Sequence, residues 1–252
     1  GNSLNYLGEF ESYAILNDKI QIHELAKKLK IQVPEIYNSR DNSIIPFVAK
    51  PTNLSSAKGL IYIKKNNDIS KIPNVKNLMF QEFVEGEGVG FSCYCKDGKV
   101  YNGYGHKRLA EYPITGGSST YRNLYQDQRM NNIVSKIISY LNYTGFAMFE
   151  FKLLKNNELL LIEVNPRIWG SINQGLANGN NYFEKILGLS KVNQKSKSRI
   201  YRTYLSPLFY LSICKYLISG NLKILFKFIL NLRTNKVDVS SIRDMKGYIS
   251  LI

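Results

Sequence analysis

Residues 145–171 read GFAMFEFKLLKNNELLLIEVNPRIWGS, and this stretch decides the fold. Apolar residues dominate the segments on either side of its polar middle, which predicts two neighbouring strands. Asn156-Asn157 suits a two-residue hairpin turn, because asparagine tolerates the positive φ angles that such turns need. We therefore predict an antiparallel hairpin in which Lys155 lies opposite Glu158.

This register brings two acidic side chains together. Glu150 falls directly opposite Glu163, and Asn165 returns to the same face two residues later. The other face is apolar, with the pairs Phe149/Val164, Phe151/Ile162 and Leu153/Leu160. Like charges that face each other destabilise a sheet unless a cation or a shared proton lies between them. Two carboxylates and an amide oxygen favour a hard ion such as Mg²⁺, and the alternative is an exposed face with solvated glutamates.

An arginine follows these groups at once, in Glu163-Val-Asn-Pro-Arg167. A guanidinium beside a divalent ion suits a phosphoryl group, because the two cations together neutralise its charge. The Walker pattern GxxxxGK[ST] is absent from the sequence. Gly86-x-Gly88-x-Gly90 leads into a strand and not a helix, so we interpret it as a flexible hinge.

The rest of the chain predicts an α+β protein. Helices are expected at 19–30, with Asp18 as N-cap, and near 127–141. Strands are expected at 47–50, 60–64, 78–84, 91–95, 100–106, 146–154 and 159–164. This order predicts two α+β lobes that are joined near residues 84–90.

Composition excludes several classes of protein. The 252 residues are 44% hydrophobic and 21% charged, which argues against disorder and leaves enough apolar residues for a core. Two histidines exclude a histidine-rich zinc site, and three cysteines without a CxxC pair argue against a secreted disulfide scaffold. The N-terminal segment lacks the pattern of a signal peptide, so we expect a cytoplasmic protein.

Positive charge is concentrated near the C-terminus. The formal net charge is +15, and residues 191–252 hold twelve Lys or Arg residues against two acids. Such a tail suits an anionic partner, phospholipid or nucleic acid, and a solvated basic face is an equal alternative. We expect no specific nucleic acid, and peripheral membrane contact, if any, through residues 203–233.

An amphipathic helix is expected inside this tail, because Lys223, Lys227 and Asn231 recur every four positions. The spacing leaves an apolar face made of Leu222, Leu225, Phe226, Ile229 and Leu230. We expect this face to pack on the domain, in preference to lying on a membrane surface.

Several motifs resemble the ATP-grasp superfamily. They are FVAKP at 47–51, QEFVEG at 81–86, HKRLAEYPITGGSS at 106–119, GFAMFEFK at 145–152 and IEVNPRIWGS at 162–171. The resemblance is strongest to the carboxylate–amine ligases related to carbamoyl-phosphate synthase and biotin carboxylase. It implies two lobes, at 1–84 and 85–190, whose antiparallel sheets enclose ATP, and a basic helical extension at 191–252. Members usually carry an α/β domain before these lobes, which this chain is expected to lack.

The resemblance also implies the nucleotide-binding residues. Lys19 and Lys50 match lysines that bind the phosphates, and the backbone around Gln81, Glu82 and Val84 would bind the adenine edge. No acid matches the one with which relatives hold the ribose hydroxyls, and Glu85 or Glu87 would take its place. Three residues match the ligands of Mg²⁺, or of Mn²⁺ in its place: Glu150, Glu163 and Asn165.

The implied reaction is ADP-forming ligation of a carboxylate to an amine through an acyl phosphate. Arg167, together with Lys50, would stabilise the transferred phosphoryl group. Arg108, beside His106 and Lys107, would orient the acyl substrate. Gly116 and Gly117 would belong to the nucleotide-binding residues and let the backbone approach substrate or phosphate closely.

A departure from the family supports a second hypothesis. The loop Thr52–Lys58 stands where relatives carry a glycine-rich phosphate lid. The alternative is therefore a catalytically weak ATP-binding module, whose basic tail docks on an anionic membrane or on nucleic acid.

Overall fold

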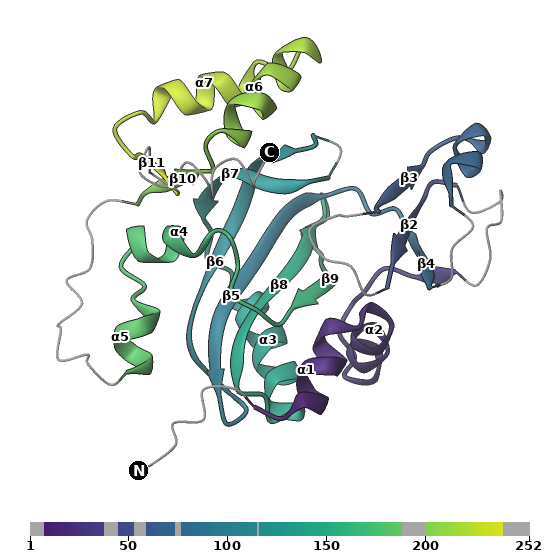
Figure 1. The fold of residues 1–252 in the computed structure, drawn as a ribbon, viewed down its shortest axis with the longest axis vertical. Helices are drawn as coiled ribbons and strands as arrows, with labels where there is room; N and C mark the ends of the chain where they lie inside the picture. Colours follow the sequence, from purple (N-terminus) through teal and green to yellow (C-terminus); the bar gives the residue numbers. More distant parts are fainter. Residues whose placement is uncertain are drawn as a thin grey trace. The chain divides into compact units, whose positions relative to one another are not determined.

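The computed structural model describes residues 8–37, 45–52, 59–73, 77–114, 116–187 and 200–238. Figure 1 labels the helices and strands of the chain. The chain divides into two compact units. The first comprises Gly1–Tyr101 and Asp127–Arg167, and the second comprises Asn102–Gln126 and Ile168–Ile252. The predicted lobe boundaries at 84 and 190 follow a different division and stay a prediction.

The first unit is built from helices and two sets of strands. Its helices are α1 (Phe10–Asn17), α2 (Lys19–Lys28), the 3₁₀-helix Asn66–Lys71 and α3 (Gln128–Tyr140). Its strands are β1 (Ile36–Tyr37), β2 (Phe47–Pro51), β3 (Ile61–Ile63), β4 (Leu78–Glu82), β5 (Glu87–Lys96), β8 (Gly145–Leu153) and β9 (Leu159–Asn165). As predicted, Asp18 caps α2: its carboxylate accepts hydrogen bonds from the backbone N–H groups of Ile20 and Gln21.

The second unit contains most of β6 (Lys99–Tyr112), together with the C-terminal elements. These are β7 (Ser118–Leu124), α4 (Ile172–Ala177), α5 (Tyr182–Ile186), β10 (Arg202–Tyr204), α6 (Leu208–Ile218), α7 (Lys223–Leu230) and β11 (Asn235–Val237). The sequence analysis did not predict β7, β10 or β11.

The described strands form two sheets. One has four strands in the order β1-β4-β2-β3, and the other has seven in the order β11-β10-β7-β6-β5-β8-β9. Neighbouring strands for which the pairing is described run antiparallel, except β10 and β11, which are parallel. This arrangement confirms the predicted α+β class.

The turn between β8 and β9 differs from the prediction. The Leu154 N–H donates to the Glu158 carbonyl at 2.8 Å, and the Asn157 N–H donates to the Leu154 carbonyl at 3.0 Å. The loop therefore has three residues, 155–157, and the predicted opposition of Lys155 and Glu158 is wrong. Asn157, at φ 68°, takes the left-handed position that such a loop requires. Hairpin loops of two and of three residues both favour asparagine at a position with positive φ. The sequence therefore did not distinguish the two loop lengths.

A β-bulge then restores the predicted pairing farther from the turn. Phe151 pairs with Leu161 and Glu150 with Glu163, so Ile162 is the extra residue. The predicted pairs Phe151/Ile162 and Leu153/Leu160 are therefore wrong. The pairs Phe149/Val164 and Glu150/Glu163 are confirmed, because the longer loop and the bulge each shift the register by one residue in opposite directions.

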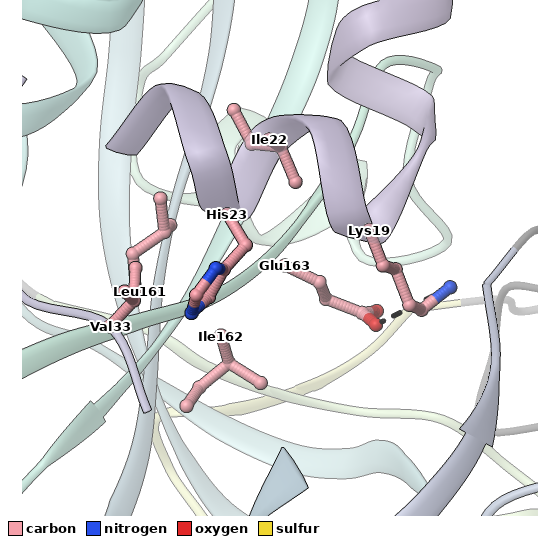
Figure 2. Close-up of a pocket in the computed structure, with 7 residues that line it drawn as sticks. All are labelled: Lys19, Ile22, His23, Val33, Leu161, Ile162 and Glu163. Atoms are coloured by element: carbon pink, nitrogen blue, oxygen red, sulfur yellow. Dashed lines mark ion pairs between the residues drawn. The ribbon is translucent and has the colours of Figure 1, made fainter. Parts of the chain in front are cut away.

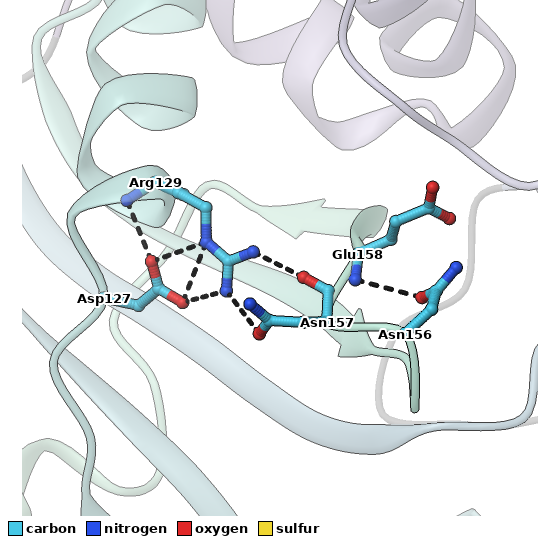
Figure 3. A network of polar contacts seen from close by, with 5 residues as sticks. All are labelled: Asp127, Arg129, Asn156, Asn157 and Glu158. Atoms are coloured by element: carbon cyan, nitrogen blue, oxygen red, sulfur yellow. Dashed lines mark hydrogen bonds and ion pairs between the residues drawn. The ribbon is translucent and has the colours of Figure 1, made fainter.

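Arg129, in the first turn of α3, binds this turn (Figure 3). Its guanidinium donates to the side-chain oxygen of Asn157 at 3.2 Å and to the carboxylate of Asp127 at 2.6 Å. The Glu158 N–H donates to the Asn156 side chain at 3.1 Å. These bonds support the loop geometry on which the register of β8 and β9 depends.

Two of the three glycines at 86–90 belong to a strand and not to a flexible hinge, and Gly86 lies in the bend that precedes it. Gly88 and Gly90 lie in β5 and pair with Lys152 and Glu150 of β8. The ladder of backbone hydrogen bonds holds them in an extended conformation, so this prediction was wrong. Because Gly90 has no side chain, β5 places none beside Glu150 at this pair.

The tail helices pack on the second unit through a different face from the one predicted. Phe209 of α6 is buried with Ala110 and Tyr121, and Ile224 and Phe228 of α7 pack against this cluster. The predicted packing face of α7 is wrong for four of its residues, which are exposed: Leu222, Phe226, Ile229 and Leu230. Periodicity located an apolar face, but α7 has apolar residues on both sides. No helix in the described ranges is long and apolar enough to span a bilayer.

Candidate functional site

Six predicted site residues cluster in the first unit, contributed by four elements and the segment that follows β9. Lys19 is the first residue of α2, Lys50 lies in β2, Glu150 lies in β8, and Glu163 and Asn165 lie in β9. Arg167 follows β9 directly, and its backbone N–H donates to the Asn165 carbonyl at 2.9 Å.

Lys19 and Glu163 form an ion pair at the start of α2 (Figure 2). The Lys19 Nζ lies 3.9 Å from Glu163 Oε2, and the two side chains are only 9% and 17% exposed. The Asp18 cap fixes the position of Lys19, because it sets where the helix begins. A small pocket next to the pair is lined by Lys19, Ile22, His23, Val33, Leu161, Ile162 and Glu163.

Lys50 is a buried cation in the same cluster, with 5% of its surface exposed. Burial is the largest effect on its ammonium group and lowers its pKa to about 8, a shift that the Lys19 charge increases. The carboxylates of Glu163 and Glu150 oppose this shift. A more highly charged anion that bound beside Lys50 would stabilise its ammonium form further than the two glutamates do.

Asn165 connects the acidic and basic groups. Its amide nitrogen donates to Glu163 Oε1 at 3.1 Å, and its amide oxygen accepts from Arg167 Nη2 at 3.4 Å. Its side chain is nearly fully buried. Glu163, Asn165 and Arg167, which alternate along the chain, therefore contact one another in that order.

These residues fit a divalent ion that arrives with an anion. Glu150 and Glu163 face each other, and Asn165 lies beside them with its amide nitrogen toward Glu163 and its oxygen toward Arg167. Lys19 and Lys50 lie near the two carboxylates, so the cluster favours a metal–anion complex over a bare ion. The described residues contain no group of three or more His, Cys, Asp or Glu side chains placed to hold a metal.

The residues predicted to bind adenine and ribose lie along β4 and the start of β5. Gln81 is buried in β4, and Glu82 ends that strand. The Glu82 N–H donates to the Glu35 carbonyl at 2.9 Å, and its carboxylate accepts from the Glu35 N–H at 3.1 Å. The Glu82 N–H is therefore already bonded to the chain itself. Val84 is half-buried, and Glu87 begins β5 in an exposed position.

The predicted acyl-substrate residues lie in the second unit. Arg108 Nη1 is 3.3 Å from Glu111 Oε1 and 3.4 Å from the Gly117 carbonyl. A Cβ at Gly117 would lie 2.0 Å from the Tyr112 carbonyl oxygen, so glycine is required there by the chain itself. The Gly116 N–H is bonded to the Pro113 carbonyl at 3.2 Å.

The two neighbours of Arg108 in β6 lie in different surroundings, and their assistance to it stays a prediction. Lys107 points to the opposite face of β6, and its ammonium lies 5.8 Å from the centre of the Tyr125 ring. His106 is buried, and burial, with Arg108 and Arg122, lowers its pKa to about 3. The imidazole is therefore neutral at physiological pH.

The sequence analysis missed a buried ion pair. Arg122 of β7 lies opposite Arg108 in the register of β6 and β7. Its Nη1 is 2.6 Å from Asp238 Oδ2, and the two side chains are 1% and 0% exposed. Thr120, Tyr121 and Arg122 are buried in succession in Ser118–Leu124, so this strand has no alternating pattern that the sequence could have revealed. The predicted phosphate lid at 53–58 lies outside the described residues.

The chain belongs to the ATP-grasp domain family, whose model matches residues 16–171. This match confirms the predicted superfamily and fold. It includes Lys19, Lys50, Glu150, Glu163 and Arg167. No curated protein sequence matches the chain significantly.

Solved structures with this fold include three from different enzymes. The biotin carboxylase domain of 2-oxoglutarate carboxylase from Hydrogenobacter thermophilus, in complex with MgADP, ADP and bicarbonate, is 13% identical, with a TM-score of 0.59 over 72% of this chain and 47% of that one. Carboxyaminoimidazole ribonucleotide synthase from Aspergillus clavatus, complexed with ATP, is 15% identical, with a TM-score of 0.63 over 75% and 56%. An L-amino acid ligase from Bacillus licheniformis is 16% identical, with a TM-score of 0.52 over 68% and 44%. The chain thus spans about half the length of each of these proteins.

Proposed function

We propose that the protein is an ATP- and Mg²⁺-dependent carboxylate–amine ligase that forms ADP through an acyl-phosphate intermediate. The observation that carries this proposal is the opposition of Glu150 and Glu163, with Lys19 and Lys50 beside them. Membership of the ATP-grasp family and the likeness to structures of an amino acid ligase and a biotin carboxylase support it. A cytoplasmic location is part of the same proposal.

The residues of the first unit would bind the nucleotide. Lys19 and Lys50 provide ammonium groups for phosphate oxygens, and the backbone around Glu82 and Val84 provides polar groups for the adenine edge. Glu87 would hold the ribose hydroxyls. Glu150, Glu163 and Asn165 would hold Mg²⁺ or Mn²⁺, which supplies charge neutralisation at the phosphates when it is bound.

The reaction requires two transfers. A carboxylate oxygen of the acid substrate attacks the γ-phosphorus, the bond from that phosphorus to the β-phosphate oxygen breaks, and ADP leaves. The amine nitrogen then attacks the acyl carbon, and inorganic phosphate leaves as the amide forms. Arg167 stabilises charge on the transferred group, and Arg108 orients the acyl substrate. Positioning and electrostatics, not covalent chemistry by the protein, would supply most of the rate.

ADP release during incubation with ATP, Mg²⁺ and a panel of amino acids tests this function. Glu163→Gln and Arg167→Ala should each lower the rate by about 10²–10³, since each removes a charge at the phosphoryl group. Glu158→Gln is the matched control, because Glu158 is an exposed glutamate of the same hairpin. Its rate should equal that of the wild type.

Unfolding of the protein, measured with and without ATP beside the ADP assay, separates catalysis from nucleotide binding. ATP at 100 times its dissociation constant should stabilise the folded protein by about 2.7 kcal/mol, whether or not turnover follows. Stabilisation without amine-dependent ADP release in the wild type would overturn the ligase proposal in favour of an ATP-binding module. ADP release that is unchanged in both site variants would show that the site lies elsewhere.

A further inference from the structure

The α6–α7 hairpin presents apolar side chains on the side away from its own core. Phe209 and Phe228 hold the two helices together, with ring centroids 4.7 Å apart, and both face the buried cluster with Tyr121. The other side, here called the outer apolar face, consists of Leu211, Ile218, Leu222, Phe226, Ile229 and Leu230. Ile218 and Leu230 are each 82% exposed. Helical spacing puts Leu222, Phe226, Ile229 and Leu230 on the side of α7 opposite Phe228, and exposed apolar side chains gathered on one helix face mark a binding surface.

The charge around this face has one sign. Five cations of the described tail are exposed: Lys215, Lys223, Lys227, Arg233 and Lys236. Asp238 is the one acid among residues 200–238, and it is buried in its ion pair with Arg122. The exposed surface of this segment therefore carries positive charge without compensating acids.

We propose that the α6–α7 hairpin docks on the surface of an anionic lipid bilayer. Apolar side chains that enter the interface, flanked by lysines that contact acidic headgroups, define helices that lie on a membrane. The eleven residues of α6 extend only about 16 Å, against the roughly 30 Å of a bilayer core, so the hairpin lies on the surface and does not cross it.

Other occupants fit the surface less well. A second copy of the chain in a two-fold contact would bring the same lysines together, where they repel one another. A nucleic acid would bind the cations but would leave Ile218 and Leu230 in water. An anionic bilayer would pair its headgroups with the lysines and would remove the apolar side chains from water.

Binding to vesicles tests the proposal on the full chain. Cys214 is the exposed cysteine, whereas Cys93 and Cys95 are buried, so an environment-sensitive dye can be attached to α6 selectively. Vesicles with 30% phosphatidylglycerol in phosphatidylcholine should shift the dye emission to the blue and sediment the protein. Vesicles of phosphatidylcholine alone should bind at least tenfold more weakly, because each lysine at an anionic surface contributes about fivefold.

Two pairs of variants test the outer apolar face and the lysines in turn, each against a matched change elsewhere on the chain. Ile218→Asp/Leu230→Asp should lower binding to the anionic vesicles at least tenfold, whereas Phe10→Asp, at a 79% exposed residue of α1, should leave it unchanged. Lys223→Glu/Lys227→Glu should also lower it at least tenfold. Lys96→Glu/Lys99→Glu makes the same charge change at exposed residues of the β5–β6 hairpin and should have a small effect.

Several results would overturn the proposal. One is vesicle binding that is unchanged in Ile218→Asp/Leu230→Asp. Another is an equal loss of vesicle binding in the two pairs of lysine variants. A third is the absence of vesicle binding by a wild type whose melting curve is normal. A dimer in solution that Ile218→Asp/Leu230→Asp dissociates would assign the face to a second copy instead. Tight, salt-dependent binding of nucleic acid that does not need Ile218 and Leu230 would assign the lysines to that partner. ADP release without vesicles is measured separately, so failure of either proposal can be recognised.

Discussion

Asparagine in place of Asp238 should destabilise the protein strongly, because Arg122 would keep its charge without a buried counter-ion. The two side chains are 1% and 0% exposed, and their closest nitrogen and oxygen are 2.6 Å apart. Removal of one partner from such a pair costs about 3–5 kcal/mol. In a protein of this size that loss lowers the melting temperature by roughly 6–20 °C.

Urea denaturation followed by tryptophan fluorescence measures this loss. Trp169 is the one tryptophan of the chain, is 1% exposed and belongs to the second unit, which also contains Arg122 and Asp238. Asp97→Asn is the control, since Asp97 is exposed, and it should change the free energy of unfolding by less than about 0.5 kcal/mol.

A double variant tests the physical cause. Arg122→Met/Asp238→Leu removes both charges together, so its free energy of unfolding should lie within about 1–2 kcal/mol of the wild type. Each single substitution should be much worse than the pair. If Asp238→Asn loses less than 1 kcal/mol, or if the double variant loses the sum of the two singles, the uncompensated charge is not the cause.

Three further outcomes are expected. The lowered pKa of Lys50 means that the unfolded chain binds more protons between about pH 8 and 10.5, so stability should rise with pH there. Between pH 7 and 10 the wild type should gain about 2–3 kcal/mol relative to Lys50→Met in urea denaturation, and parallel curves would contradict this. Asn157→Val should lose about 1–2 kcal/mol relative to Asn157→Gly, because valine resists a φ of 68°; equal melting temperatures would refute the turn geometry. Gly117→Ala should lower stability by roughly 1–3 kcal/mol through its collision with the Tyr112 carbonyl, and an unchanged melting curve would show that the loop yields freely.

The sequence predicted the elements whose signals are local and strong. Asp18 marked the start of α2, and the polar turn at 155–157 marked the hairpin. The opposition of Glu150 and Glu163 was also predicted, although through a turn and a register that were both off by one residue. The conclusion survived because the two errors cancel at that point.

Elements that depend on distant partners were not predicted. The three-residue strands β10 and β11 have no pattern of their own and exist because they pair with β7 and with each other. The Arg122–Asp238 contact joins residues 116 positions apart, which no local motif reveals. In α7, apolar residues surround the helix, so periodicity could not tell the packed side from the exposed one.

The paired offsets in the β8–β9 hairpin limit how this region can change during evolution. Deleting one residue from the loop at 155–157 without removing Ile162 would move Glu163 out of step with Glu150 and turn alternate side chains over. Insertions and deletions between Glu150 and Glu163 must therefore occur in matched pairs, one in the loop and one at the bulge. Homologues with a two-residue turn should have a second strand without a β-bulge. The length of the turn therefore predicts whether the bulge is present.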